Sequence, residues 1–363
     1  MNRLISWKDT DWVLLGAALL IAVMGIVQIY STTAGTRFAG AHVRQIYWVL
    51  LGIGLLLFVC FYDYHNLLNY APWFYLVVLG LLVTTLLVGN EISGARRWIQ
   101  LGGLSIQISE IAKLSVILLL ARFLGEFHQV GEVSLLDLGK VALAIGVPTV
   151  LIALQPDLGT ALTMVPIALV SLFLAGLRLR YFGAMLLIGV LALPIAVHFL
   201  KPYQKERIAT FLNPEADPKD SGYQVLQSKI AVGSGQLWGK GTAQGTQTQL
   251  RFLPVPHTDF IFAAYAEEHG FLGVLFGLML YCIAMLRLVS SAQTAPDAAG
   301  MFLVAGFLGV FAFQVLVNVG MVVGYLPVTG IPLPLMSYGG SSVVFTCLAI
   351  GLANSVRIRR FVN

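Results

Sequence analysis

The stretch Pro254-Val-Pro-His-Thr-Asp-Phe-Ile-Phe-Ala-Ala-Tyr-Ala-Glu-Glu-His-Gly270 ends a long polar loop and begins an apolar helix. Its two prolines stiffen the approach to the helix, because Pro fixes φ and biases the residue before it away from helical conformation. Asp259 follows them at the point where loop and helix meet. The sequence therefore predicts an acidic side chain in a defined position where water meets hydrocarbon.

The composition around this stretch is that of a polytopic membrane protein. Of the 363 residues, 58% are hydrophobic and 11% are charged, whereas a soluble domain is about 45–50% apolar and about 25% charged. The formal net charge of +5 does not indicate nucleic-acid binding, because Lys and Arg are spread over many loops. Cys60, Cys282 and Cys347 lie in apolar runs without metal-ligand spacing, so no disulfide framework is expected. No cleavable signal is expected either, since the first apolar run is long enough to span.

The apolar runs predict an all-α fold of about ten transmembrane helices, each needing about 20 apolar residues. The predicted spans are Val13–Tyr30, Ile46–Tyr62, Trp73–Val88, Ile108–Arg122, Val141–Leu154, Leu158–Ala175, Phe182–Phe199, Phe260–Leu286, Gly300–Val323 and Leu335–Val356. A long loop, residues 200–258, separates the seventh span from the eighth. We expect a single domain over residues 1–363, with both termini on the same side of the membrane because the number of spans is even.

Lys and Arg in the short loops set the orientation of such a protein. With the N-terminus inside, the inner segments carry Arg3, Lys8, Arg122, Lys140, Arg178, Arg180, Arg287, Arg357, Arg359 and Arg360, and the short outer loops carry Arg37, Arg44, Arg96 and Arg97. This bias predicts cytoplasmic termini and an extracytoplasmic long loop. The long loop is itself basic, which indicates either solvated surface charge or an anionic partner.

Glu110 and Lys113 are charged residues inside the fourth predicted span. Three residues apart, they share one face of a helix. A charge in the bilayer costs about 2.5–3.5 kcal/mol on the insertion scale, so such groups face each other or a polar cavity. The pair is either a structural ion pair or part of a cavity wall in which Lys113 offers a cation to a phosphate.

Two outer segments carry further candidate ligands. In Gln155-Pro-Asp-Leu-Gly-Thr160, Asp157 can cap the helix that starts at Leu158, bind a ligand, or do both. In Gly94-Ala-Arg-Arg-Trp-Ile99, two arginines beside a Trp are typical of an interfacial anchor. Phosphate contact by Arg96 or Arg97 is the alternative function of that segment.

Two glycine-containing stretches differ in what they predict. The glycines between Gly233 and Gly245 lack the spacing of a nucleotide-binding P-loop, and they indicate tight turns instead. The stretch from Gly324 to Ser341 combines Pro and Gly with apolar residues. Irregular backbone at membrane depth is tolerated where it is buried or lines a cavity. That stretch is therefore either a plain loop or part of the outer cavity that Asp259 faces.

Asp259 itself has two interpretations. Asp259 or Thr258 could cap the following helix, or Asp259 could act as a general base. Burial against neighbouring Phe side chains would raise the pKa of Asp259, while nearby Lys or Arg would lower it. Glu267 and Glu268 lie further along the helix and are weaker candidates for chemistry.

Taken together, these motifs resemble the SEDS family (shape, elongation, division and sporulation) of polytopic peptidoglycan polymerases. The resemblance covers the chain from the third span to the last. Its short N-terminal tail is more similar to the RodA-type than to the FtsW-type branch of the family. The matching residues are Gly94–Ile99, Ser109-Glu110 with Lys113, Gln155–Thr160, Arg207-Ile208 with Phe211 and Pro214, Gln227-Ser228 with the glycines after them, Thr258–Phe262 with Glu267 and Gly270, and Pro334–Ser341.

The resemblance implies a glycosyltransferase of the bacterial cytoplasmic membrane that polymerises lipid II outside the membrane during cell elongation. It implies a class B penicillin-binding protein as partner, within the elongation machinery. It also implies that Asp259 is catalytic and that Glu110 and Lys113 occupy important cavity positions. Arg96, Asp157, Arg207 and Ser337 are then candidates for binding pyrophosphate or sugar.

The chemistry of lipid II is consistent with these residues. The acceptor hydroxyl needs a base, which Asp259 supplies. The leaving pyrophosphate needs positive charge from Lys113, from arginines or from a divalent cation such as Mg²⁺ or Mn²⁺, and no nucleotide is required. The alternatives are a lipid II flippase, which several helices and a Pro/Gly-broken outer segment also suit, and a non-enzymatic scaffold.

Overall fold

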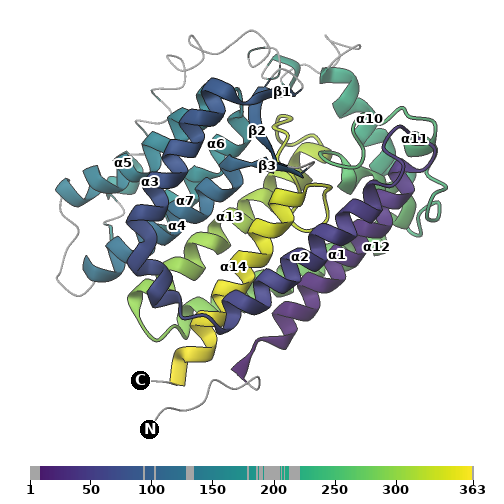
Figure 1. Cartoon of the computed structure of the whole chain (residues 1–363). Helices are drawn as coiled ribbons and strands as arrows, with labels where there is room; N and C mark the ends of the chain where they lie inside the picture. The colour runs from purple at the N-terminus through teal and green to yellow at the C-terminus, as the bar shows by residue number, and fades with distance from the viewer. Residues whose placement is uncertain are drawn as a thin grey trace.

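The computed structural model describes residues 9–361 except 93–94, 102–103, 128–134, 178–179, 185–186, 188–190, 192–204, 206, 208 and 212–220. Within these residues the chain is a bundle of helices with one small sheet (Figure 1). Seven helices of this part are long and apolar enough to cross a membrane, by length and composition. They are α1 (Trp12–Thr33), α2 (Ala41–Phe61), α3 (Tyr64–Val88), α5 (Leu135–Leu154), α12 (Ile261–Gln293), α13 (Ala298–Val322) and α14 (Gly340–Ile358).

The remaining elements are shorter or more polar. They are α4 (Ile108–Phe127), α6 (Leu158–Leu162), α7 (Met164–Leu174), α10 (Ser221–Ser234), α11 (Thr246–Gln249), the 3₁₀ turn η3 (Arg359–Phe361), and the strands β1 (Asn90–Ile92), β2 (Ala95–Leu101) and β3 (Leu104–Gln107). The all-α polytopic class is confirmed. Most of the predicted seventh span, Phe182–Phe199, lies outside the described residues.

Several predicted boundaries were wrong: α2 and α5 begin earlier than predicted, and α4 and α12 end later. Three other spans also differ. The third helix begins at Tyr64 rather than Trp73, because Asp63 caps it by accepting a hydrogen bond from the His65 amide at 3.0 Å. The sixth span is divided into α6 and α7, which meet at Thr163. The last helix begins at Gly340, because the residues from Leu335 onward form an irregular turn.

Aspartate caps mark the end of the bundle where both termini lie (Figure 1). Asp11 caps α1 through the Leu14 amide at 3.1 Å, and Asp297 caps α13 through the Gly300 amide at 2.7 Å. Arg287 near the end of α12 pairs with Asp11 at 2.9 Å. Charged groups therefore gather at this end, as expected where helices leave a membrane.

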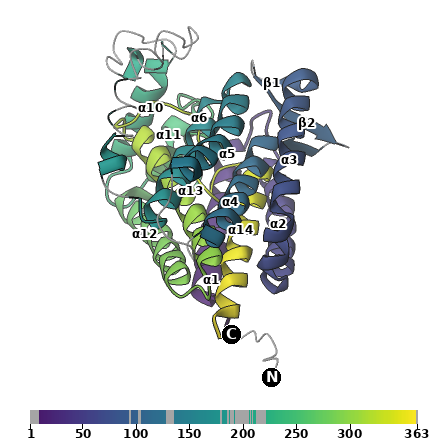
Figure 2. The ribbon, with the colours of Figure 1, turned by 90° about the vertical axis from the view of Figure 1, so that its left-hand side faces the viewer.

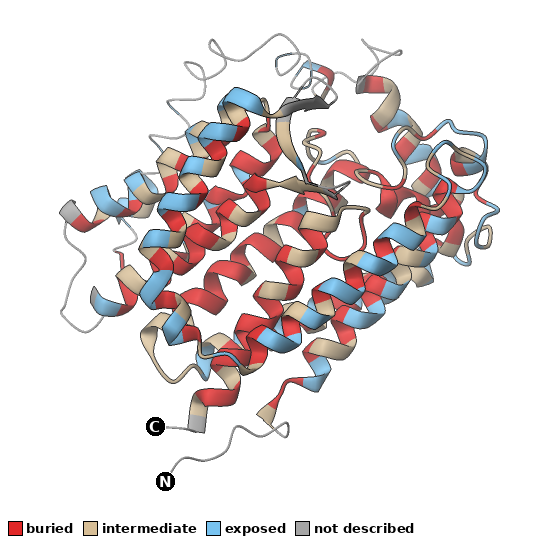
Figure 3. Cartoon of the chain, viewed as in Figure 1, coloured by how far each residue is buried: buried red, intermediate tan, exposed pale blue. Residues whose placement is uncertain are grey.

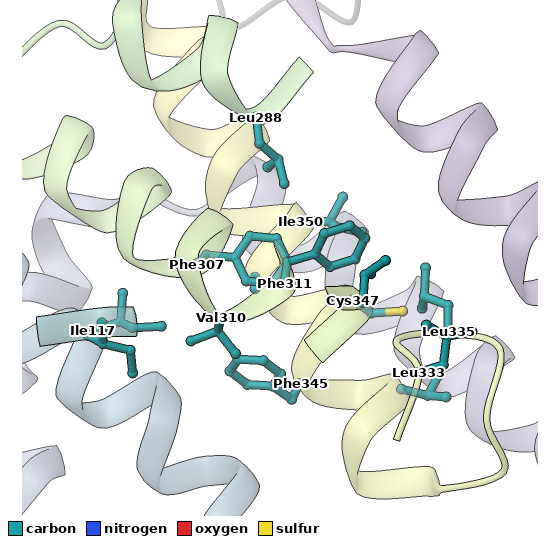
Figure 4. Packing of buried hydrophobic residues seen from close by; sticks show 14 of the residues in the cluster. Ile117, Leu288, Phe307, Val310, Phe311, Leu333, Leu335, Phe345, Cys347 and Ile350 are labelled. Atoms are coloured by element: carbon teal, nitrogen blue, oxygen red, sulfur yellow. The ribbon is translucent and has the colours of Figure 1, made fainter. Parts of the chain in front are cut away.

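Helices α13 and α14 form the centre of the bundle (Figure 3). In their most apolar 18-residue stretches 67% and 78% of the residues are buried, whereas the corresponding share in α3 is 28%. Phe307 on α13 packs against Phe345 on α14, with ring centroids 6.1 Å apart (Figure 4). The more exposed helices carry apolar side chains outward, which is the surface that lipid covers.

A three-stranded antiparallel sheet lies at the end of the bundle opposite to the termini (Figures 1 and 2). In its register Trp98 of β2 pairs with Gln107 of β3. The Gln107 amide donates to the Ser341 hydroxyl at 3.0 Å, which ties the sheet to the start of α14. The segment expected to be an interfacial anchor after the third span is thus strand β2.

Helix α12 is broken at Gly270, whose φ of 63° and ψ of −165° are not helical. The two amides after Gly270 donate to carbonyls in the loop segment 235–241, at 2.7 and 3.2 Å. Amides of the same segment donate back to the carbonyls of Glu267 and Glu268, at 3.0 and 2.9 Å. The outer loop therefore satisfies the backbone groups that the break exposes, as a broken helix in a membrane requires.

We expect Gly270→Ala to destabilise the protein strongly. The added Cβ would lie 2.3 Å from the Gly239 nitrogen, and this backbone conformation is essentially restricted to glycine, at a cost of about 1–3 kcal/mol before any clash. Thermal unfolding in detergent should show a lower midpoint. The control is Gly233→Ala in α10, where a Cβ meets nothing within 4 Å. Equal midpoints for the two variants would contradict the role of the break.

Candidate active site

Asp259 is half-buried and lies in the turn that precedes α12. Its main-chain carbonyl accepts a hydrogen bond from the Asn318 amide group at 3.1 Å, and the same group donates to the Ile331 carbonyl at 2.8 Å. Asn318 is fully buried on α13. It therefore joins the approach to α12 with the irregular stretch before α14.

The irregular stretch is attached to Asp259's neighbours by further bonds. The Ser337 hydroxyl donates to the Thr258 carbonyl at 2.7 Å and accepts from the Leu333 amide at 2.8 Å. Gln45 of α2 is fully buried and donates to the Ser337 carbonyl at 3.1 Å. Ser337 thus positions the backbone around Asp259, and contact of its side chain with substrate stays a prediction.

The capping interpretation of Asp259 and Thr258 is wrong. The N-cap of α12 is Phe260, and no side chain makes a capping hydrogen bond there. The carboxylate of Asp259 instead lies beside Gly330, where an added Cβ would be 3.5 Å from Oδ2. The acid is thereby left available for chemistry.

Asp157 caps α6, as predicted, by accepting from the Thr160 amide at 3.3 Å. It also pairs with Arg97 of β2, whose Nη1 lies 3.3 Å from Oδ1, and accepts from the Gln107 side chain at 2.8 Å. The cap is therefore also part of a polar cluster at the mouth of the bundle. Arg96 lies in β2, and its side chain is outside the described residues.

The clusters around Asp157 and Asp259 flank the same piece of backbone. Gly159 of α6 packs against the Thr329 carbonyl so closely that a Cβ would lie 2.4 Å from its oxygen. The next residue, Gly330, faces Asp259. The segments that carry Asp157 and Asp259 therefore meet across residues 329–330, and the close approach requires a residue without a side chain at position 159.

The charges around Asp259 oppose the effect of burial. Burial raises the pKa of Asp259, the positive charges of Arg207 and Arg97 and a hydrogen bond with Thr258 lower it, and the negative charge of Asp157 raises it. Both directions agree with the sequence-based expectation. Arg207 is exposed and lines a shallow hollow whose other residues are Thr210, Phe211, Val225, Pro327 and Val328. Asp259 is thus an acid whose neutral form is favoured by burial and whose charged form is favoured by two arginines.

Glu110 and Lys113 form the predicted pair in the first turns of α4. The Lys113 ammonium lies 2.9 Å from each Glu110 oxygen, and both residues are buried. The ammonium also lies 4.4 Å from the centroid of the Phe345 ring on α14. These contacts fit a structural pair, and a role in the cavity wall stays a prediction.

Glu267 and Glu268 hold the outer loop and α1 rather than Asp259. Glu267 accepts from the Lys240 ammonium at 2.8 Å and from the Gln247 amide at 2.9 Å. Glu268 accepts from the Ser31 hydroxyl and from the Gln28 side chain, the latter at 3.3 Å. Both acids are fully engaged in structure, consistent with their being weaker candidates for chemistry.

Sequence reasoning missed Asn318 and Gln45 as parts of the site. Each is an uncharged polar residue in an apolar helix, and polar residues inside the membrane commonly face the protein interior. That signal was available for both residues. No group of three or more His, Cys, Asp or Glu side chains that could hold a metal ion occurs in the described ranges.

Comparison with known proteins adds an independent line of support. The profile of the FtsW/RodA/SpoVE family, described as "Cell cycle protein", matches residues 11–361. Similar proteins include "Peptidoglycan glycosyltransferase MrdB" of Escherichia coli, 38% identical over 97% of this chain and 96% of the relative. "Peptidoglycan glycosyltransferase RodA" of Treponema pallidum is 34% identical over 99% and 100%.

Solved structures are similar over almost the whole chain. One, described as "Structural coordination of polymerization and crosslinking by a peptidoglycan synthase complex", has a TM-score of 0.84 at 35% identity and covers 98% of this chain and 100% of that one. Rod shape determining protein RodA of Thermus thermophilus has a TM-score of 0.74 at 32% identity, over 98% and 99%. The chain therefore belongs to the FtsW/RodA/SpoVE family, the SEDS family that its motifs resemble.

Proposed function

We propose that this multi-pass protein of the bacterial inner membrane is a peptidoglycan glycosyltransferase that polymerises lipid II at the outer face. The observation that carries the proposal is the half-buried Asp259 carboxylate, fixed through its backbone by Asn318 and influenced by Arg97 and Arg207. The relatives named as peptidoglycan glycosyltransferases support it. The cytoplasmic orientation of the termini follows the distribution of Lys and Arg.

In the proposed reaction, ionised Asp259 accepts the proton of the acceptor sugar hydroxyl from about 2.6–3.2 Å. The hydroxyl oxygen bonds to the anomeric carbon of the donor as the bond from that carbon to pyrophosphate breaks, with inversion. The pyrophosphate leaves on its polyprenyl carrier. Arg97 and Arg207 stabilise the charge that develops on it, because positive groups that already stand at the site need little reorganisation during the reaction.

The remaining predicted ligands keep their proposed roles. Arg96 and Asp157 lie on the outer side, where pyrophosphate or sugar would bind, and Lys113 offers a buried cation. A divalent cation carried in on the pyrophosphate is part of the proposal as well. The test is to add EDTA during polymerisation. If a divalent cation is required, the rate of polymerisation should fall and should recover when Mg²⁺ or Mn²⁺ is added in excess.

The partner is proposed to be a class B penicillin-binding protein of the elongation machinery. Support comes from the similar structure, which is described as a peptidoglycan synthase complex. Such a partner would crosslink the strands that this chain makes. An alternative, division-type role within the same family differs in partner rather than in chemistry.

The test is to give lipid II to the purified chain in detergent, alone and with a candidate partner, and to separate the products on a gel. A ladder of glycan strands is expected, at least with the partner. A flippase has no second compartment in detergent and would leave lipid II unchanged. The proposal would be overturned if lipid II stayed unchanged under both conditions although a thermal unfolding transition shows that the protein is folded.

The rate of polymerisation should depend on pH through Asp259. Its pKa is raised above the ordinary 3.8, and the base works only when ionised, so activity is lost as pH falls through that raised value. Arg97→Gln removes a charge that lowers this pKa and should move the acid limb of kcat/KM to higher pH. Asp157→Asn removes a charge that raises it and should move the limb to lower pH. Arg251→Gln, an exposed outer arginine, is the control that should leave the limb in place.

A further inference from the structure

Residues 235–239 form a tight turn in the outer loop, closed by a hydrogen bond of 2.8 Å from the Gly239 amide to the Gly235 carbonyl. The tip of the turn consists of Leu237 and Trp238, which are 59% and 80% exposed. No charged residue lies within the turn, and the next residue, Lys240, directs its ammonium to Glu267 at 2.8 Å. The tip is therefore a small apolar projection without a charge.

The turn is fixed to the outer part of α12, beside the break at Gly270. The amides of Phe271 and Leu272 donate to the Gln236 and Leu237 carbonyls, at 2.7 and 3.2 Å. Phe271 and Leu272 are themselves 58% and 44% exposed. The apolar tip therefore continues the outward, lipid-facing surface of a membrane helix.

The height of the tip follows from the length of α12. The 16 steps from Phe271 to Arg287 rise about 24 Å along the helix, at about 1.5 Å per residue. Arg287 pairs with Asp11 at the opposite, charged end of the bundle. The hydrocarbon core of a bilayer is about 30 Å thick, and a tilted helix spans less height than its length. With Arg287 at one boundary, Phe271 therefore lies about 6 Å or more inside the other boundary, in the outer part of the acyl region.

We propose that Leu237 and Trp238 insert into the outer leaflet, at the boundary between lipid headgroups and acyl chains. Indole suits this boundary, because its apolar rings enter the acyl region while its N–H reaches polar headgroups. The turn is bonded to the residues after the helix break, and the next two residues in the chain are bonded to the carbonyls of Glu267 and Glu268 before it. Lipid contact at the tip would therefore hold the part of α12 around the break at a fixed depth in the membrane. This inference does not depend on the reaction that the protein catalyses.

The experiment measures the depth of Trp238 in the full chain reconstituted into phospholipid nanodiscs without any partner. The fluorescence spectrum of Trp238→Phe is subtracted from that of the wild type, and the difference is the emission of Trp238 without that of the five other tryptophans. We expect quenching by lipids brominated near the headgroup end of the acyl chain, weaker quenching by bromines near the chain terminus, and little quenching by aqueous acrylamide. The positive control is the same difference spectrum for Trp73→Phe, because Trp73 is 71% exposed on the membrane helix α3 and should be quenched by brominated lipid.

Strong acrylamide quenching with no effect of brominated lipid would overturn the proposal and leave the tip free for a protein partner. A second variant covers the case in which Trp238→Phe does not fold. Leu237→Cys in a Cys282→Ser background, which removes the one exposed native cysteine, is labelled with the fluorophore NBD. Protection of the label from aqueous dithionite in nanodiscs supports insertion, and immediate reduction contradicts it.

Discussion

Asp259→Asn is expected to abolish glycan synthesis and to leave a folded protein. An amide of the same shape cannot accept the proton of the acceptor hydroxyl, and loss of a general base typically lowers the rate by about 10²–10⁴-fold. The hydrogen bond from Asn318 goes to the main-chain carbonyl of residue 259, so the substitution does not remove it. Because burial already disfavours the charged carboxylate, its neutralisation should not destabilise the fold.

The measurement is the initial rate of lipid II consumption beside the thermal unfolding midpoint. The matched control is Glu126→Gln, the same change of carboxylate to amide at a side chain that is 67% exposed on α4. The control should polymerise at the wild-type rate. A rate for Asp259→Asn within a few-fold of the control would show that another group accepts the proton.

Local signals in the sequence were sufficient for part of this site. Asp157 stands directly before the helix that it caps. Glu110 and Lys113 stand three residues apart in an apolar run, which leaves them few partners but each other. In each case the residue and its partner are close in the chain, so spacing alone predicts the contact. The two prolines before Asp259 predicted a stiff, extended approach, whereas residues 253–260 form bends and turns, with a φ of 43° at the residue between the prolines.

Features that depend on distant segments could not be predicted in the same way. The break in α12 requires the loop segment 235–241 to supply hydrogen bonds, and a single glycine in an apolar run does not reveal it. Strand β2 exists because β3 pairs with it, whereas its sequence is equally typical of an interfacial anchor. Long-range pairing decided both structures.

Residues that act through backbone contacts were hardest to recognise. Asn318 and Gln45 bond to carbonyls 59 and 292 residues away in sequence, and neither carries a charge. Ser337 was assigned to substrate binding because it lies in a family motif, and its hydroxyl bonds to two main-chain groups beside Asp259. A motif therefore marks the neighbourhood of a site more securely than it marks which side chain touches the ligand.

Glu110→Gln is expected to destabilise the protein severely, because it leaves the Lys113 ammonium buried without a counterion. Removing one partner of a buried pair costs about 3–5 kcal/mol, and the pair has side-chain exposures of 0% and 3%. The control is again Glu126→Gln, which breaks the exposed pair with Arg122 and should cost about 0.3–0.5 kcal/mol. Unfolding midpoints of the purified variants in detergent test the difference.

The double variant Glu110→Gln, Lys113→Met separates a structural pair from a functional one. Removing both charges relieves the unpaired ammonium, so most of the lost stability should return, because an apolar replacement of a buried pair is often neutral or stabilising. If Lys113 also stabilises the leaving pyrophosphate, the double variant stays slow in polymerisation although it is stable, since the cation is gone. Recovery of both stability and rate would mean that the pair only joins α4 to its neighbours. A double variant as unstable as Glu110→Gln would instead show that the contact of the Lys113 ammonium with the Phe345 ring, 4.4 Å from its centroid, stabilises the packing of α4 on α14.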